Sequence, residues 1–202
     1  MPKALNIIKD EHRSLSAVLQ GLLYLVQEVE AGRLAADFHL LRAMLHYLEA
    51  FPDAIHHPKE DRYLHPHLRA RSAEAARMLE FVEAEHRQCP QRTSGLMAEL
   101  DRYQDAGADG LPQFAAAVKA YAEFQWRHIE REENELLPLA QQVLLPEDWA
   151  EIDAGFGTHR DPLGGIEVNK EFRLLFREIA NLIPAPMGLG PGSSETGKGG
   201  GS

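Results

Sequence analysis

Apolar residues recur along much of the chain every three or four positions, the spacing of one face of an α-helix. In the N-terminal segment, the positions that share this face are Ile8, His12, Leu15, Leu19, Leu22 and Val26. Gly32 follows them and suits a helix C-cap. No segment alternates apolar and polar residues over a useful length, so the pattern predicts an all-α chain.

Glycine, proline and capping residues divide the rest of the pattern into further helices. One begins after Leu34, is interrupted at Pro52 and Pro58, and continues to about position 71. Ser72 is the expected N-cap of the next helix. The later helices are expected at about 73–104, 111–143 and 166–183.

These helices predict three parts. We expect residues 1–145 to form an up-down-up-down four-helix bundle, and residues 146–183 to form a helical extension packed on it. Residues 184–202 are rich in glycine and proline and have no hydrophobic period, so this tail is expected to be disordered.

Composition and charge limit the expected cellular location of the protein and the classes of partner that it can bind. The formal net charge of −10 argues against nucleic-acid binding, which needs a basic surface. The single cysteine, Cys89, excludes an internal disulfide framework and fits a reducing compartment. No secretory signal and no apolar run long enough for a membrane span is present. We therefore expect a cytoplasmic monomer or weak homodimer.

The chain holds ten histidines, and several belong to an internal duplication. Glu11-His12-Arg13 recurs 74 positions later as Glu85-His86-Arg87. His56-x-x-x-Glu60-x-x-x-Leu64-x-Pro66 recurs 72 positions later as His128-x-x-x-Glu132-x-x-x-Leu136-x-Pro138. Each half therefore contains a helix with one histidine, followed by a helix with His-x-x-x-Glu.

The repeated residues have the chemistry of a metal site. Residues four positions apart lie on the same helix face, so His-x-x-x-Glu can direct two ligands at one ion. A four-helix bundle would collect four imidazoles and two carboxylates in its interior. Buried carboxylates need positive partners, which two divalent ions would supply. Mixed imidazole and carboxylate ligands suit Fe, Mn or Zn.

With these motifs, the sequence resembles the hemerythrin-like, or HHE cation-binding, family over roughly residues 4–144. Its most specific stretch is His56-His57-Pro58-Lys59-Glu60-Asp61-Arg62-Tyr63-Leu64. The resemblance implies a four-helix bundle with two non-haem iron ions joined by an oxo or hydroxo bridge, with Mn or Zn as substitutes. The implied ligands are His12, His56, Glu60, His86, His128 and Glu132, with both glutamates bridging the ions.

This ligand set is similar to that of the bacterial four-His, two-Glu branch. The oxygen-carrying branch has a fifth histidine on the third helix, one turn after the first one there. Pro90 stands at that position here, so one metal would lose its third imidazole. The resemblance therefore argues against reversible oxygen carriage.

Pro58 lies inside the second helix's His-x-x-x-Glu and removes a helical hydrogen bond. We expect the helix either to kink there or to restart with Glu60 in its first turn. A restart would allow His57 to replace His56 as the ligand, whereas the repeat favours His56 because it aligns with His128.

Several other polar residues could act near the metals, but each also suits an ordinary structural role. Tyr63 and His159 are candidates for positions next to the metals, although Tyr63 suits a packed core and His159 a turn cap. Cys89 could sense oxidation but is expected to be a buried, inert thiol. Six residues are expected at bundle ends or on solvated faces: His39, His46, His65, His67, Glu133 and Glu135.

Three functions fit this interpretation. The first is binding or sensing of oxygen, nitric oxide, peroxide or a related small ligand at an open iron position. The second is an enzyme that disproportionates peroxide or reduces nitric oxide. The third is iron supply or storage for the repair of other metalloproteins. The missing fifth histidine favours reactivity or iron handling over reversible carriage.

Overall fold

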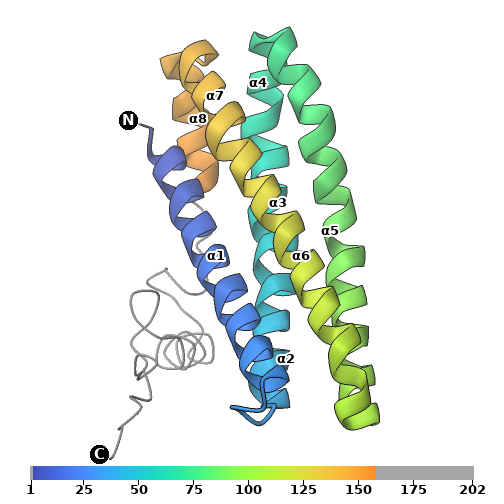
Figure 1. Ribbon diagram of the computed structural model, residues 1–202. Helices are drawn as coiled ribbons and strands as arrows, with labels where there is room; N and C mark the ends of the chain where they lie inside the picture. Colours follow the sequence, from blue (N-terminus) through green and yellow to red (C-terminus); the bar gives the residue numbers. More distant parts are fainter. Residues whose placement is uncertain (1, 158–202) are drawn as a thin grey trace, which may run out of the picture.

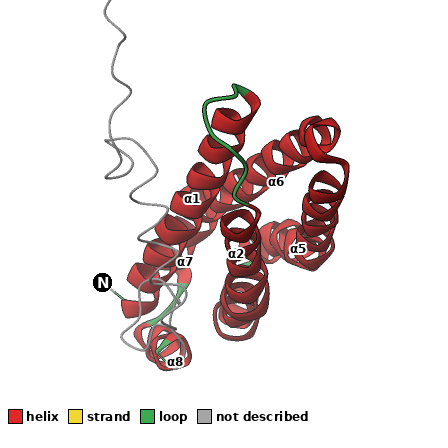
Figure 2. Ribbon diagram, turned by 90° about the horizontal axis from the view of Figure 1, so that it is seen from below, coloured by secondary structure: helices red, strands yellow, loops and turns green. Residues whose placement is uncertain are grey.

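Four helical arms run up and down beside one another in the computed structural model, which describes residues 2–157 (Figure 1). The first arm is α1 (Lys3–Glu30) and the third is α5 (Ala73–Ala106). A 3₁₀ turn, η3 (Gly107–Gly110), leads from α5 into the fourth arm. Viewed from the end, α1, α2, α5 and α6 surround a common interior (Figure 2). The described residues contain no strand, so the predicted all-α bundle is confirmed.

The second and fourth arms are built from several helical segments that follow one another. The second arm comprises α2 (Phe38–Leu48), η1 (Glu49–His56), α3 (His57–Lys59), η2 (Glu60–Leu64) and α4 (His65–Arg71). The fourth comprises α6 (Leu111–Arg131), η4 (Glu132–Leu136) and α7 (Leu137–Val143). A shorter helix, α8 (Pro146–Phe156), comes after it.

The expected helix ends are present. Gly32 adopts a φ of 69°, a left-handed conformation that suits glycine after a helix. The Ser72 side chain accepts a hydrogen bond from the backbone N–H of Ala75 at 3.2 Å, as an N-cap does. Asp37 caps α2 in the same way, accepting from Leu40.

The segments η1, η2 and η4 are π-helical turns, in which each backbone N–H bonds five residues back. The N–H of His65 bonds to the carbonyl of Glu60, and that of Leu137 to the carbonyl of Glu132. Pro66 and Pro138 come directly afterwards and have no N–H to continue the ordinary pattern. The repeated Leu-x-Pro thus places the same widened turn at both glutamates.

Pro58 has a comparable effect. The N–H of the preceding residue, His57, bonds to the carbonyl of Pro52, again five residues back. The second arm therefore stays helical through Pro58 by widening its turn. The expected restart at this position is wrong, because a π-helical turn accommodates the missing N–H without ending the helix, and the kink stays a prediction.

Two apolar cores fill the bundle and leave a polar belt between them. One core contains Leu15 of α1 and Leu96 of α5, and the other contains Ile8 and Val82 from the same two helices. His12 and His86 lie between these pairs along the chain. The belt is therefore shielded from water by packed apolar side chains on both sides.

Helix α8 packs against α1 and η2. The Asp153 carboxylate accepts hydrogen bonds from the backbone N–H groups of Lys3 and Ala4, at 3.1 and 2.7 Å, and so caps α1. Gly155 lies against the ring of Tyr63, where an added Cβ would come within 2.4 Å of the ring. The described part of the predicted extension thus contacts the bundle, and the division into three parts stays a prediction.

We expect Gly155→Ala to lower the free energy of unfolding by about 1–3 kcal/mol, because its Cβ would overlap the Tyr63 ring. Gly95→Ala is the matched control. Gly95 is an exposed helical glycine whose added Cβ would meet no atom within 4 Å, and alanine there should add about 0.5–1 kcal/mol. Urea unfolding measures both. Equal stability of the two variants would contradict the close packing of α8 on the second arm.

No helix among residues 2–157 is both long enough and apolar enough to cross a membrane. The terminal helix expected at 166–183, the tail and His159 lie outside the described residues.

Candidate metal centre

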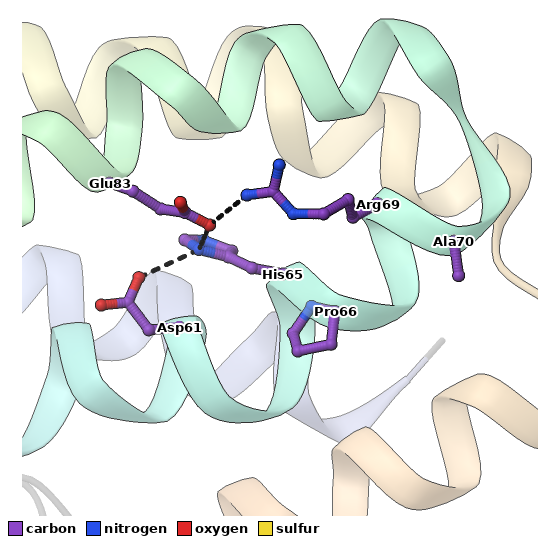
Figure 3. A pocket seen from close by; sticks show the side chains of 6 residues that line it. All are labelled: Asp61, His65, Pro66, Arg69, Ala70 and Glu83. Carbon is purple, nitrogen blue, oxygen red and sulfur yellow. Dashed lines mark hydrogen bonds and ion pairs between the residues drawn. The ribbon is translucent and has the colours of Figure 1, made fainter.

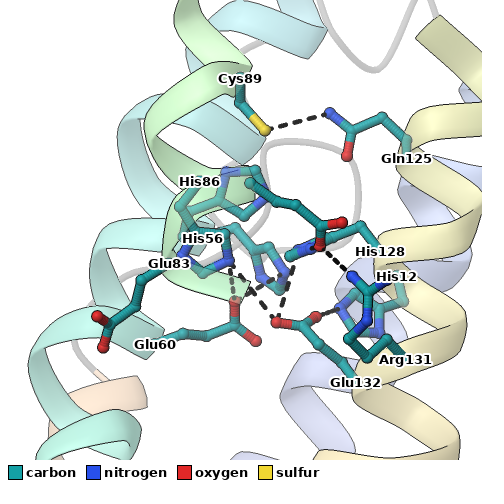
Figure 4. Close-up of polar contacts among 12 residues, drawn as sticks. His12, His56, Glu60, Glu83, His86, Cys89, Gln125, His128, Arg131 and Glu132 are labelled. Atoms are coloured by element: carbon teal, nitrogen blue, oxygen red, sulfur yellow. Dashed lines mark hydrogen bonds and ion pairs between the residues drawn. The ribbon is translucent and has the colours of Figure 1, made fainter. Parts of the chain in front are cut away.

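The polar belt brings together all six residues that the duplication singles out (Figure 4). Each arm contributes: α1 one histidine, α5 one histidine, and the second and fourth arms one His-x-x-x-Glu each. None of the six is more than 6% exposed. The six are His12, His56, Glu60, His86, His128 and Glu132.

The imidazoles form two groups, with the carboxylates between them. Potential ligand atoms of His12, His56, Glu60 and Glu132 lie within 4.8 Å of one another. A second group, also within 4.8 Å, contains His86 and His128. Glu132 faces both groups, with oxygens 3.1 Å from His12 Nε2 and 3.5 Å from His128 Nε2.

Glu60 is placed equivalently, because its Oε2 lies 3.6 Å from His56 Nε2 and 3.7 Å from His86 Nε2. Both glutamates therefore stand where a carboxylate could join two ions. The inward orientation follows from the i, i+4 spacing within each His-x-x-x-Glu.

A carboxylate lies behind every one of these imidazoles. Each accepts a hydrogen bond from Nδ1, over distances of 2.7–3.1 Å. The pairs are His12 with Glu133, His56 with Glu11, His86 with Asp61, and His128 with Glu85. Because an ionised carboxylate can only accept, Nδ1 carries the proton and Nε2 is directed inward, as in carboxylate–histidine–metal arrangements.

The duplication extends to these outer carboxylates. Glu11 and Glu85 each precede a predicted ligand histidine, yet each contacts the imidazole of the following arm. Asp61 and Glu133 each follow a predicted bridging glutamate and contact the histidine of another arm. Sequence reasoning missed all four roles. The signal that could have found them is a carboxylate adjacent to a ligand in both copies.

Glu133 in particular was expected to be solvated, which is wrong in part. Its side chain is 34% exposed but bonds His12 Nδ1 at 2.9 Å. The widened turn that begins at Glu132 lets two consecutive carboxylates face the belt and α1. Glu135 is exposed as expected.

Two cations support the outer carboxylates. Lys59, only 4% exposed, donates to Glu11 at 2.5 Å, and Arg131 donates to Glu85. These contacts compensate the charge that burial would otherwise penalise. The two inner glutamates have no lysine or arginine partner among the described contacts, and face only imidazoles.

The protonation states reflect this shortage of positive charge. Burial alone would lower the pKa of His12 and His86, but their carboxylate neighbours raise both to about 10. Burial, together with the charge of Glu132, raises the pKa of Glu60 well above its usual value. Burial opposes ionisation of Glu132 too, but the histidines around it hold its pKa well below normal. Without a metal, protons neutralise the cluster.

A family model of the hemerythrin HHE cation-binding domain matches residues 3–140. The chain belongs to this family. Comparison with curated proteins and with solved structures gave no match. Family membership and the clustered His and Glu side chains together identify a metal-binding hemerythrin domain.

Several buried polar atoms of this hemerythrin domain make no hydrogen bond, as expected for residues that bind a metal ion. The Nε2 atoms of all four inward histidines and both side-chain oxygens of Glu132 are buried without a hydrogen-bond partner. Buried polar atoms are rarely left in this state, because each costs about 1–3 kcal/mol. Imidazole nitrogens and carboxylate oxygens together suit a divalent transition metal.

His57 is an addition that the ligand prediction treated only as a substitute. Its imidazole is 2% exposed and joins His86 and His128 in the second group of potential ligand atoms. Burial, with the nearby His86 and His128, lowers its pKa well below the usual value. His56 is buried as well, so both imidazoles lie in the interior.

The remaining candidate residues of the sequence analysis are not among the six proposed ligands. Tyr63 packs on Gly155 and Arg62 and belongs to no group of potential ligand atoms among the described residues. Cys89 is fully buried, and burial raises the pKa of its thiol to about 12, which suits an inert thiol. His39 and His46 are exposed, as expected.

The prediction that His65 lies at the bundle end or surface is wrong. His65 is 1% exposed and its ring stacks on that of His86, with centroids 5.6 Å apart. The reason is the widened turn at Glu60–Leu64, after which His65 opens α4 facing α5. His67 is half-buried and paired with Asp148, outside the ligand groups.

A surface pocket opens beside the centre (Figure 3). Asp61, His65 and Glu83 line it, and His65 Nδ1 lies 3.0 Å from Asp61 and 3.5 Å from Glu83. Asp61 also accepts the hydrogen bond from His86 Nδ1. The pocket therefore lies one hydrogen bond away from a potential ligand of the centre.

Proposed function

We propose that this hemerythrin domain holds two iron ions bridged by Glu60 and Glu132, with His12 and His56 on one ion and His86 and His128 on the other. The pair would bind or react with oxygen, peroxide or nitric oxide, in oxidative or nitrosative stress or in iron handling. The single observation that supports this most is the convergence of four buried Nε2 atoms, none of which makes a hydrogen bond, on two buried carboxylates.

Iron at this position would supply electrons and an open coordination position for a small ligand. The protein residues prepare the environment. The outer carboxylates hold each imidazole in one tautomer and orientation, which strengthens it as a ligand. The apolar cores on both sides exclude bulk water, which strengthens electrostatic interactions within the belt.

Iron is favoured over a structural zinc site by the ligand set. Structural zinc sites are closed, commonly with four protein ligands and often with thiolates. Here the six proposed ligands are four imidazoles and two carboxylates with no thiolate, and the two shared carboxylates leave coordination positions free on both ions. Mn or Zn remain substitutes that the same donors could hold.

The test is metal analysis of protein matured in iron-replete cells, followed by optical spectra before and after addition of oxygen, peroxide or nitric oxide. We expect two iron ions per chain and a spectral change with at least one ligand. Fewer than two metals, or zinc alone, would contradict the proposal.

The same experiment separates ligand binding from turnover. A stable spectral adduct without consumption of the ligand supports binding or sensing. Rapid loss of peroxide with release of oxygen supports a redox enzyme instead. Transfer of iron to a metal-free acceptor protein, with no ligand adduct, would favour iron supply.

A further inference from the structure

Two consecutive histidines of the second arm both face the interior, which an ordinary helix does not favour. Neighbouring residues on an α-helix point about 100° apart. His56 and His57 are nevertheless 1% and 2% exposed. The widened turn of η1 ends at His56 and is closed by the bond from His57 N–H to the Pro52 carbonyl. Such π-helical turns occur frequently at functional sites.

The His57 imidazole lies among other potential metal ligands and makes no hydrogen bond. Its ring centroid lies 4.3 Å from that of His86 and 5.2 Å from that of His128. A potential ligand atom from each of the three lies within 4.8 Å of the other two. Both ring nitrogens of His57 are buried without a hydrogen-bond partner. A buried imidazole in that state is costly, and a bound ion would satisfy it.

A carboxylate also stands behind His57, as it does behind the other four imidazoles. Asp53 Oδ1 lies 3.8 Å from His57 Nδ1 and has no hydrogen-bond partner. Its other oxygen accepts a hydrogen bond from the Thr93 hydroxyl at 2.7 Å, which fixes the side chain. Asp53 precedes His57 by one turn and can orient its ring.

We propose that His57 is a fifth imidazole ligand of the centre, bound to the same ion as His86 and His128, with Asp53 as its positioning residue. The assignment rests on the proposed two-metal function. The third helix has Pro90 where the oxygen-carrying relatives would place their fifth histidine, and the second arm supplies the imidazole instead.

The assignment makes the two ions unequal. The second copy of the repeat has Ile129, 72 positions after His57, and Ile129 belongs to an apolar core. The ion beside His12 and His56 therefore receives two imidazoles, and the other receives three. With His57 bound, the ion with two imidazoles keeps one more free coordination position than the ion with three. With three imidazoles on the other ion, Pro90 no longer argues against oxygen carriage.

The test is a cobalt(II) titration of metal-free protein, comparing wild type with His57→Ile, which makes the two halves alike. We expect wild type to bind two ions. The variant should bind one of them at least about 10-fold more weakly, with a changed d–d absorption for that ion alone. His67→Ala is the matched control, a half-buried histidine of the same arm outside the belt, and should titrate as wild type does.

A second measurement needs no variant. In zinc-loaded wild-type protein with ¹⁵N-labelled histidine, ring-nitrogen shifts count the metal-bound imidazoles, and we expect five. Two ions with only four bound imidazoles, or a His57→Ile protein that titrates as wild type does, would overturn the role of His57 and leave the proposed function intact. Wild-type protein that takes up fewer than two ions would instead overturn the proposed function, and this assignment with it.

Discussion

Glu132→Ala should remove most of the metal from the protein, with fewer than one ion per chain retained after gel filtration. Glu132 faces imidazoles of both groups, so its loss removes a ligand from both ions at once. His128→Ala should have a similar but smaller effect, because that imidazole belongs to one group only. Losing a ligand should weaken binding at least as much as losing an outer-shell partner, which costs about 10–100-fold.

His65→Ala is the matched control for these two variants. His65 is as buried as the ligands and stacks on His86, yet it is not one of the six repeated residues. It should retain two ions per chain. Circular dichroism checks that each variant is folded, and Glu132→Gln, which keeps the side-chain volume, covers failure of the alanine variant to fold. Equal metal loss in the Glu132, His128 and His65 variants would show that the repeat does not define the ligand set.

Removing the metals should lower the melting temperature of the protein strongly. A ligand present at about 1,000 times its Kd stabilises the folded state by about 4 kcal/mol. For a domain of this size, that corresponds to about 8–16 °C for each ion. Calorimetry of protein before and after chelation measures the difference, and re-addition of iron(II) should restore it. An unchanged melting temperature would mean that the folded protein does not hold metal in the belt.

The stabilisation of the folded protein by metal should depend on pH. In metal-free protein, His12 and His86 have folded-state pKa values of about 10, above the ordinary 6.5. Their contribution to stability is therefore complete below pH 6.5 and is lost as the pH rises toward 10. Metal binding requires the deprotonated imidazoles and so improves over the same range. We expect the stabilisation by metal to grow above pH 6.5; a constant difference would contradict these protonation states.

The six inner residues could be predicted because the motif occurs twice, and each copy supports the interpretation of the other. A single His-x-x-x-Glu is common on charged helices, whereas His56/Glu60 and His128/Glu132 repeat with the same downstream Leu-x-Pro. His12 interrupts an apolar stripe, which marks it as inward without knowledge of its neighbours. The four arms followed from hydrophobic period and capping residues, both of which are local properties.

The errors have a common physical cause. The restart expected at Pro58 assumed an ordinary α-helix, which a missing N–H interrupts. The chain instead widens the turn, and that change of register carries His57 and His65 inward. Hydrophobic spacing cannot reveal such a shift, because a π-helical turn alters which residues share a face only from that point onward.

The sequence by itself therefore determined the helical arms, their order and the six repeated His and Glu residues, since periodicity and duplication are properties of a linear chain. Only the tertiary structure decided which carboxylate stands behind which imidazole. Glu11 orients His56 and Asp61 contacts His86, partners brought together by the packing of different arms. It also brought the His57 imidazole within 4.8 Å of the potential ligand atoms of His86 and His128, because the widened turn before it changes which side chains of the second arm face the interior.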